Sequence, residues 1–351
     1  MCRCVVSKCL NRNLLRDVLW LAVMTMSTAA IAQSNVTISG RFQAGFEIYA
    51  VHPALATPYP LGSDTVVSNM GGAAADTMLN GAHSMPLSRR VNAGEKTFWV
   101  AGDWGKDEHS YRNGDLGLAE IGWGHNYGSF QFNASLGKTK AEQDFQQSNT
   151  FKAEGTYLYA ELLMPISGSL WAVLGGYGHW GENEFIRKGA PDTQLPNSQS
   201  LGLRARLEWD KIVRIGNTGL SPYADLSFNE TRIAAHTEFL FGSLRIKGSR
   251  EKSTELRLGL NASLPLTDTT KILGAIEATH RFEKSGAKTT AKYIGGAGFE
   301  LPGREFKQDW LRVGAGVEGK LGNGVASLML NATTQGEMPN IWLAASWQTK
   351  F

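Results

Sequence analysis

The stretch DWLRVGAGVEGKL, residues 309–321, alternates apolar residues with polar residues and glycine along its whole length. Its apolar side chains fall on one face of an extended strand, and they are Leu311, Val313, Ala315, Val317 and Leu321. Arg312 and Glu318 fall on the opposite face. A period of two indicates a strand with one apolar face. The stretch is longer than the roughly 5 or 6 residues of a typical soluble strand, and it can cross a bilayer when tilted.

The same alternation recurs from residue 96 to the end of the chain, interrupted by turn residues. The candidate strands are 96–104, 114–124, 128–138, 155–163, 169–181, 199–210, 219–231, 253–264, 271–282, 309–321, 324–333 and 341–351. This count of about twelve is even, as an antiparallel barrel with both ends on one side requires. Short turns alternate with long polar connections, which are predicted as loops at 139–154, 182–198, 232–252 and 283–308. The sequence therefore predicts an all-β fold, a transmembrane antiparallel β-barrel of about twelve strands.

Composition agrees with a barrel but does not select it over a soluble β-sandwich. Glycine is abundant, with 40 of 351 residues. No apolar run after residue 32 approaches the roughly 18 residues that indicate a transmembrane helix. Aromatic residues collect near the ends of the candidate strands, which predicts two interfacial girdles in the membrane. They are Phe98, Trp99, Trp104, Trp123, Trp171, Trp180, Trp209, Tyr223, Trp310, Trp342 and Phe351.

Residues 1–32 have the features of a secretory signal peptide. The basic residues at its start are Arg3, Lys8, Arg12 and Arg16. A short apolar core follows at 18–26, and Ala30 and Ala32 form an A-x-A cleavage site before Gln33. That core is too short for a membrane-spanning helix, which needs about 20 apolar residues. We therefore expect export and a mature chain that starts at Gln33.

The mature chain lacks the residues that several other functional classes need. All three cysteines, Cys2, Cys4 and Cys9, lie in the signal peptide, so disulfides and cysteine-ligated metals are not expected. That peptide holds four of the 35 basic and one of the 32 acidic residues, which leaves 31 of each and no indication of nucleic-acid binding. The seven histidines are scattered without metal-ligand spacing, so we expect neither a metal site nor a cofactor. No hydrolase or nucleotide-binding motif is present, so catalytic residues are not expected.

The last strand ends the chain on an aromatic residue. Ile341, Leu343, Ala345, Trp347 and Phe351 fall on one face of the stretch 341–351. This ending resembles the assembly signal of bacterial outer-membrane proteins, carried here by Leu343, Ala345, Trp347 and Phe351. The resemblance implies that the barrel-assembly machinery and periplasmic chaperones are partners. It also implies an outer membrane of a Gram-negative bacterium, with its lipid and lipopolysaccharide, as the surroundings.

Residues 96–351 as a whole resemble the C-terminal translocator domain of autotransporters, a monomeric barrel that anchors or translocates an N-terminal segment. The most similar stretches are KTFWVAGDWG at 96–105, SLGLRARLEWD and GLSPYADLSF within 200–228, STELRLGLNASLPL at 253–266, and residues 309–332 with the terminal strand. By this resemblance, residues 33–75 form a short N-terminal segment, a vestigial passenger. Residues 76–95 form the linker, which runs through the pore.

The resemblance also assigns roles within the pore. Residues 73–82 have good helix propensity, so the start of the linker is predicted to be helical. Inward charges are expected to line the pore and hold the linker, and they are Arg204, Arg206, Glu208, Arg257, Glu277, Arg281, Arg312 and Glu318. The pair Asn80-Gly81 is prone to cyclisation of the asparagine, which resembles the self-cleavage of some autotransporters. We therefore note it as a possible linker cleavage site.

Two alternative functions remain open at this point. Residues 35–50 (NVTISGRFQAGFEIYA) alternate like a membrane strand and resemble the first strand of general porins. A porin would have a larger, trimeric barrel of about sixteen strands, so strand number separates the two possibilities. A lipid-modifying or proteolytic barrel enzyme would need rim residues such as His109 beside Asp107 and Glu108, or His236 near Glu238.

Overall fold

The structure is a computed structural model, and it describes most of the chain from residue 75 onward. The described residues are 75, 78–79, 81, 83–109, 112–145, 149–186, 193–239, 243–296, 298–334, 336 and 338–351. The predicted signal peptide, the porin-like stretch 35–50 and Asn80 lie outside them. The helices among the described residues include none that is long and apolar enough to cross a membrane.

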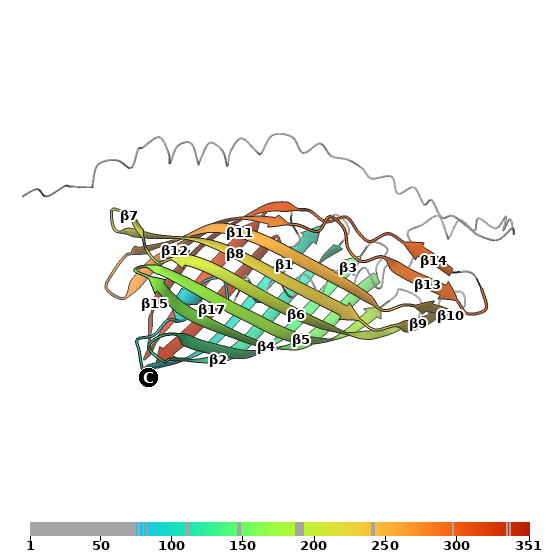
Figure 1. Cartoon of the computed structure of the whole chain (residues 1–351), viewed down its shortest axis with the longest axis horizontal. Helices are drawn as coiled ribbons and strands as arrows, with labels where there is room; N and C mark the ends of the chain where they lie inside the picture. The colour runs from blue at the N-terminus through green and yellow to red at the C-terminus, as the bar shows by residue number, and fades with distance from the viewer. Residues whose placement is uncertain are drawn as a thin grey trace, which may run out of the picture. The chain divides into compact units, whose positions relative to one another are not determined.

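Twelve antiparallel strands form a closed barrel, as the sequence predicted (Figure 1). They are β1 (Lys96–His109), β2 (Arg112–Asn126), β3 (Gln131–Phe145), β4 (Asn149–Ser167), β5 (Leu170–Ile186), β6 (Thr193–Trp209), β8 (Thr218–Ile233), β11 (Ser249–Pro265), β12 (Thr270–Arg281), β15 (Asp309–Leu321), β16 (Gly324–Thr333) and β17 (Ile341–Lys350). Neighbours in sequence pair with each other, and β17 pairs with β1 to close the ring. A short additional strand, β7 (Val213–Ile215), pairs with the start of β8.

The alternation in the sequence becomes an apolar outer face and a polar inner face. Val100, Ile121, Leu136 and Leu158 are register partners on neighbouring strands, and all are exposed on the outside. Because residues directly opposite in register point to the same face, each strand adds one step to a continuous apolar band. Lipid covers such a band in a membrane, while the backbone groups are satisfied by the closed ladder. Charged and polar side chains occupy the inside.

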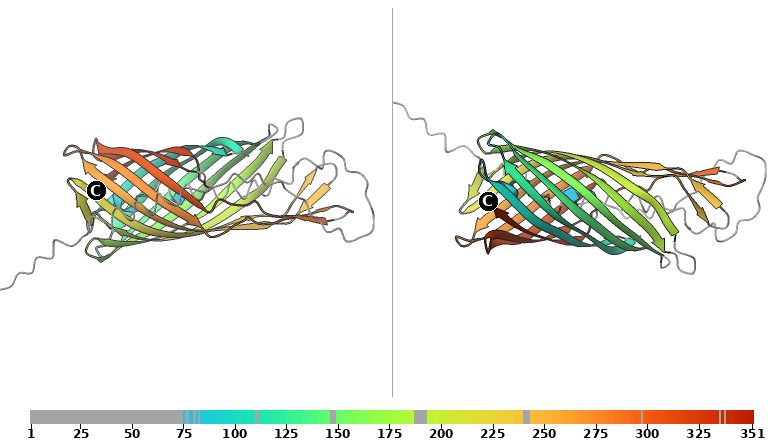
Figure 2. Two further views of the ribbon diagram at one scale, coloured as in Figure 1. Left: turned by 90° about the horizontal axis from the view of Figure 1, so that it is seen from above. Right: turned by 90° about the horizontal axis from the view of Figure 1, so that it is seen from below.

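Short turns lie at the end of the barrel that also holds the C-terminus (Figure 2). The turn between β4 and β5 contains Gly168 with φ 54°, and the turn between β15 and β16 contains Gly322 with φ 61°. Positive φ values favour glycine, which explains why these residues interrupt the apolar alternation. The same end is tied together by Lys96 and Phe351, whose backbone groups exchange two hydrogen bonds of 2.9 and 3.0 Å.

The long connections at the other end contain more strand than the sequence predicted. The predicted loop 139–154 is mostly β3 and β4, which run to Phe145 and start at Asn149. Four of their charged residues face outward and form ion pairs, with Lys140 3.4 Å from Glu154 and Lys152 3.6 Å from Glu142. Within 232–252 and 283–308, the chain forms a second sheet of β9 (His236–Phe239), β10 (Ser243–Ile246), β13 (Thr289–Tyr293) and β14 (Gly298–Leu301). The polar composition of these stretches predicted loops. A strand that extends beyond the membrane is equally polar, because its outer side faces water.

The predicted aromatic girdle also needs correction. Trp104 and Trp180 are exposed on the outer face, as expected of interfacial residues. In contrast, four of the aromatic residues are at most 3% exposed and point into the barrel, namely Trp99, Tyr223, Trp310 and Trp342. They have the parity of the polar inner face, so they pack inside the lumen rather than at the membrane surface.

Candidate functional site in the barrel lumen

The described residues of the predicted linker (76–95), together with Ala75 just before it, lie in the lumen, and the helical residues among them present one apolar face. Ala75, Met78 and Leu79 are helical and fully buried. Their spacing of three and four residues places them on one side of a helix. They form one apolar cluster with inward side chains of β2, β4 and β5, which are Leu118, Tyr157, Tyr159 and Tyr177. The inner wall of the barrel therefore provides an apolar surface against which the predicted helix packs.

Glu120 of the barrel wall binds two side chains of the linker, His83 and Arg89. It projects inward from β2, and its carboxylate is fully buried. His83 Nε2 lies 3.1 Å from Glu120 Oε2, and Arg89 Nη2 donates to Glu120 Oε1 at 3.0 Å. Arg89 Nη1 also lies 2.9 Å from His83 Nδ1. Because a guanidinium only donates, His83 Nδ1 must accept, and the ring proton on Nε2 must point to Glu120. Arg89, His83 and Glu120 thus form a continuous hydrogen-bonded ring.

The barrel wall satisfies the rest of the Glu120 carboxylate. Trp99 Nε1 donates to Oε1 at 2.8 Å. Ser135 Oγ and Tyr157 OH donate to Oε2 at 2.8 and 2.9 Å. A buried carboxylate is stable only when its charge is paired and its lone pairs are satisfied. Glu120 therefore depends on the linker for its charge partner and on three neighbouring strands for its hydrogen bonds.

Arg204 of β6 holds the backbone of the linker. Its Nη1 donates to the carbonyl oxygens of Leu79 and His83 at 3.1 and 2.7 Å. Its Nε donates to Asp225 of β8 at 2.7 Å, which fixes the guanidinium in place. The free carbonyls at the end of a helix carry partial negative charge, so a cation there is favourable. Arg204 therefore binds backbone atoms of the linker, and this contact does not depend on which linker side chains are present.

The linker leaves the lumen at the end of the barrel that holds the short turns, and several contacts fix it there. Gln131 accepts from the backbone N–H of Val91 at 2.9 Å and donates to the carbonyl of Arg89 at 2.9 Å. Arg90 forms a 2.9 Å ion pair with Asp210. A 3-10 helix, η2 (Pro86–Arg89), precedes these contacts and sets the direction of the chain.

A small turn then connects the linker to β1. The backbone N–H and the side-chain amide of Asn92 donate to the Glu95 carboxylate at 3.0 and 2.9 Å. These hydrogen bonds from Asn92 lower the pKa of the exposed Glu95 carboxyl below its ordinary value. The turn therefore keeps Glu95 ionised and holds the start of β1 beside β2.

A small cavity borders the linker inside the barrel. A cavity of about 60 Å³ lies between the linker and the opposite wall. Ser84 and Ser88 line it from the linker, and Ala101, Ser327 and Ser346 line it from β1, β16 and β17. A volume of this size holds only a few water molecules.

The inward charges named from the sequence pair mainly with charged residues of the barrel wall. Arg204, Arg206, Glu208, Arg257, Glu277, Arg281 and Arg312 are inward and buried, and Glu318 is half-buried beside Lys271. Their partners include Glu208 for Arg206 at 2.7 Å and Glu277 for Arg312 at 3.1 Å. Among the contacts that the structure describes, only Arg204 of this set bonds to the linker. Glu120, Trp99 and Gln131 also contact the linker, although the sequence did not predict this role for them.

The other residues singled out in the sequence lie elsewhere. Asp107 faces inward and accepts from Gln143 at 2.6 Å. The described part of the chain holds no group of three or more potential metal ligands. On the terminal strand, Leu343 and Phe351 are exposed, and Trp347 Nε1 donates to the carbonyl of Leu321 at 3.2 Å. Ala345 is half-buried on the same outward face.

Comparison with known proteins places this barrel in a family. The family model described as "Autotransporter beta-domain" matches residues 98–333. The chain belongs to the autotransporter β-domain family. A search of curated protein sequences found no match.

Two solved structures share the fold of this autotransporter β-domain. The translocator domain of the autotransporter NalP from Neisseria meningitidis matches with a TM-score of 0.64 and 13% identity, covering 82% of this chain and 98% of that one. The β domain of the Bordetella autotransporter BrkA matches with a TM-score of 0.55 and 14% identity, covering 74% of this chain and 100% of that one.

Membership in this family favours the autotransporter interpretation over the porin among the functions left open by the sequence. Autotransporter β-domains are outer-membrane barrels of Gram-negative bacteria, and they are generally transport barrels rather than enzymes. The closed ring of twelve strands agrees with an autotransporter and is smaller than the roughly sixteen-stranded barrel expected of a general porin. The chain is therefore an outer-membrane barrel of autotransporter type.

Proposed function

We propose that this barrel retains its linker in the lumen after assembly, where the linker closes the pore and tethers the N-terminal segment to the membrane. The observation that carries this proposal is the buried ring formed by Glu120 with His83 and Arg89. In this proposal the barrel acts as a monomer without enzymatic turnover.

The energetics favour a retained linker over a sliding one. Moving the linker by one residue would separate Arg89 from Glu120 and break their buried ion pair. Breaking a buried ion pair in this way costs roughly 3 to 5 kcal/mol. Arg204 adds two hydrogen bonds to the linker backbone, and charge-assisted bonds contribute about 1.5 to 3 kcal/mol each. The linker is therefore held at one position.

Single-channel conductance tests the proposal directly. We expect the refolded mature barrel to be closed or nearly closed, and a variant lacking residues 33–90 to form an open pore. A variant lacking only residues 33–74 is the matched control, because it keeps His83, Arg89 and the helical residues from Ala75. We expect this control to remain closed. Equal, large conductance steps in all three proteins would show that the linker does not close the pore.

We further propose that the chain reaches the outer membrane through its signal peptide and terminal strand. Cleavage follows Ala32, and the assembly machinery and its chaperones recognise the strand that ends in Phe351. The intact mass of the protein extracted from outer membranes should therefore correspond to a chain that starts at Gln33. A mass that includes residues 1–32 would contradict processing at this site.

The same mass spectrum tests scission of the linker between Asn80 and Gly81. Cyclisation of Asn80 would release residues 33–80 and leave His83 and Arg89 bound in the lumen. An additional species that starts at Gly81 would show scission. A single species that contains both residues would show that the tether stays covalent.

A further inference from the structure

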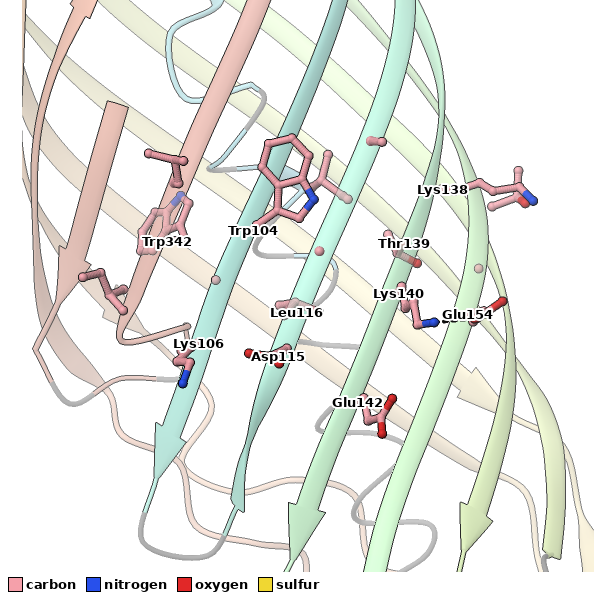
Figure 3. A pocket seen from close by; sticks show the side chains of 18 of the residues that line it. Trp104, Lys106, Asp115, Leu116, Lys138, Thr139, Lys140, Glu142, Glu154 and Trp342 are labelled. Carbon is pink, nitrogen blue, oxygen red and sulfur yellow. Dashed lines mark ion pairs between the residues drawn. The ribbon is translucent and has the colours of Figure 1, made fainter. Parts of the chain in front are cut away.

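A broad hollow lies on the outer face of the barrel, over strands β1 to β5 and next to β16 and β17. Its volume is about 1010 Å³. Figure 3 shows Trp104, Lys106 and Asp115 at one side of the hollow and Lys138, Lys140 and Glu154 at the other. The hollow lies where the apolar band ends, because Leu136 and Leu158 below it are followed on the same strands by Lys138 and Thr156. It therefore faces the boundary between lipid tails and headgroups.

The floor of the hollow is apolar and flat. Outward Gly117 and Ala119 of β2 contribute almost no side chain to it. The ring of Trp104 lies across Gly117 and Gly102, and a Cβ placed on Gly102 would be 2.8 Å from Trp104 Cη2. Tryptophan is a preferred residue at membrane interfaces, where its ring packs against lipid and its N–H faces water.

A second tryptophan borders the hollow on β5. The ring of Trp180 lies over outward Gly178, with a Cβ on that glycine 3.0 Å from Trp180 Cη2. Trp180 is 54% exposed and Trp104 is 55% exposed, so both rings present a face to whatever fills the hollow. Two flat rings on either side of a smooth floor can receive acyl chains between them and a sugar ring above them.

The outer rim combines cations with carboxylates. Lys140 pairs with Glu154 at 3.4 Å, and Lys152 pairs with Glu142 at 3.6 Å. Lys106 and Lys138 form no ion pair within the described part of the chain, and neither do Asp115 and Glu182. The rim therefore offers ammonium groups for phosphate together with carboxylate oxygens that accept hydrogen bonds.

We propose that this hollow binds a phosphorylated glycolipid of the outer leaflet. Lys106 and Lys138 bind its phosphates, Asp115 and Glu182 accept hydrogen bonds from its sugar hydroxyls, and the acyl chains lie on the floor beside Trp104. A glycerophospholipid supplies the phosphate but few hydroxyl donors, so it leaves the carboxylates without partners and places them near its own negative charge. The mixed rim thus favours the glycolipid. This inference concerns the outer wall and does not depend on the linker.

The test measures glycolipid retained by the intact mature barrel. The protein is extracted from outer membranes in a mild detergent, and bound lipid is counted by native mass spectrometry. We expect the double variant Lys106→Glu with Lys138→Glu to retain roughly tenfold less glycolipid than the unchanged protein, a loss equivalent to about 1.4 kcal/mol of binding. The matched control is Lys252→Glu on β11, an exposed outward lysine outside the hollow, which should retain as much as the unchanged protein.

Two further measurements separate this site from general attraction. Trp104→Ala with Trp180→Ala should also lower retention several-fold, because the apolar contacts are lost while the charges remain. Phosphatidylglycerol added in competition should displace little of the bound glycolipid. Equal retention by all variants, or displacement by phosphatidylglycerol at equal concentration, would overturn the proposal. The heat-modifiable mobility of each variant on a gel verifies that the barrel is folded.

Discussion

Replacing Glu120 by alanine should release the linker from the lumen and destabilise the barrel at the same time. The change leaves Arg89 buried without its carboxylate and removes the acceptor of Trp99 Nε1. Loss of one partner of a buried ion pair costs roughly 3 to 5 kcal/mol. We expect frequent opening events in single-channel recordings and faster proteolysis of the linker in the folded barrel.

Glu161 supplies a matched control for this substitution. It is an inward, buried glutamate on β4, and it accepts from Asn133 at 2.8 Å and from Tyr159 at 3.1 Å. Its described hydrogen bonds are to the wall and not to the linker. Glu161→Ala should therefore lower stability but open the pore less often than Glu120→Ala. If both variants open the pore equally, then general loosening of the wall, not the loss of the linker contact, explains the effect.

A second variant separates the charge from the shape of the site. Replacing both partners, as in Glu120→Gln with Arg89→Gln, leaves two neutral groups that can still form hydrogen bonds. Removing both members of a buried ion pair is commonly less damaging than removing one. The double variant should therefore open less often than Glu120→Ala. More frequent opening in the double variant would show that the pair is not the main restraint.

The strands could be predicted because the residues of each membrane strand alternate between apolar side chains that face lipid and polar side chains that face the lumen. Each of the twelve segments carries its own alternation, and no knowledge of neighbouring strands was needed to find it. The ends of the strands were less accessible to this reasoning. Beyond the membrane, Lys140 and Glu142 of β3 face water, and a water-facing strand has the polarity of a loop. Only the pairing with β4 identifies this stretch as strand.

The site could be predicted only in part. The alternation along a strand shows whether a side chain faces inward or outward, but it does not show how far along the pore the side chain lies or which residues surround it. The positions of Arg204 and Arg312 in the alternation of their strands place both side chains inside the barrel. Whether either one meets the linker depends on the register between strands and on where the linker helix ends. Glu120 has the same inward parity between Leu118 and Gly122 on β2. Its importance arises from Trp99 and Ser135, which reach it from the two adjacent strands.

Replacing Gly122 by valine should disrupt the site through packing alone. Gly122 lies opposite Trp99 in the register of β1 and β2, and both face inward. A Cβ on Gly122 would lie 2.1 Å from Trp99 Cζ2, so the indole ring must move. Moving it breaks its hydrogen bond to Glu120 and forces overpacking, which costs roughly 1 to 3 kcal/mol or more. We expect poor barrel assembly and, in the folded fraction, a linker accessible to protease.

The control and the rescue make this last prediction specific to Trp99. Gly319→Val also places a β-branched residue at a glycine inside a strand, but its Cβ would lie 3.6 Å from its nearest neighbour, an ordinary contact. This control should assemble normally. Gly122→Val combined with Trp99→Ala should recover assembly, because the smaller side chain vacates the space that the valine needs. It should not recover the closed linker, since Glu120 still lacks the indole donor. If Gly122→Val alone assembles and protects the linker as well as the unchanged barrel, the close packing of Trp99 on Gly122 does not control the site.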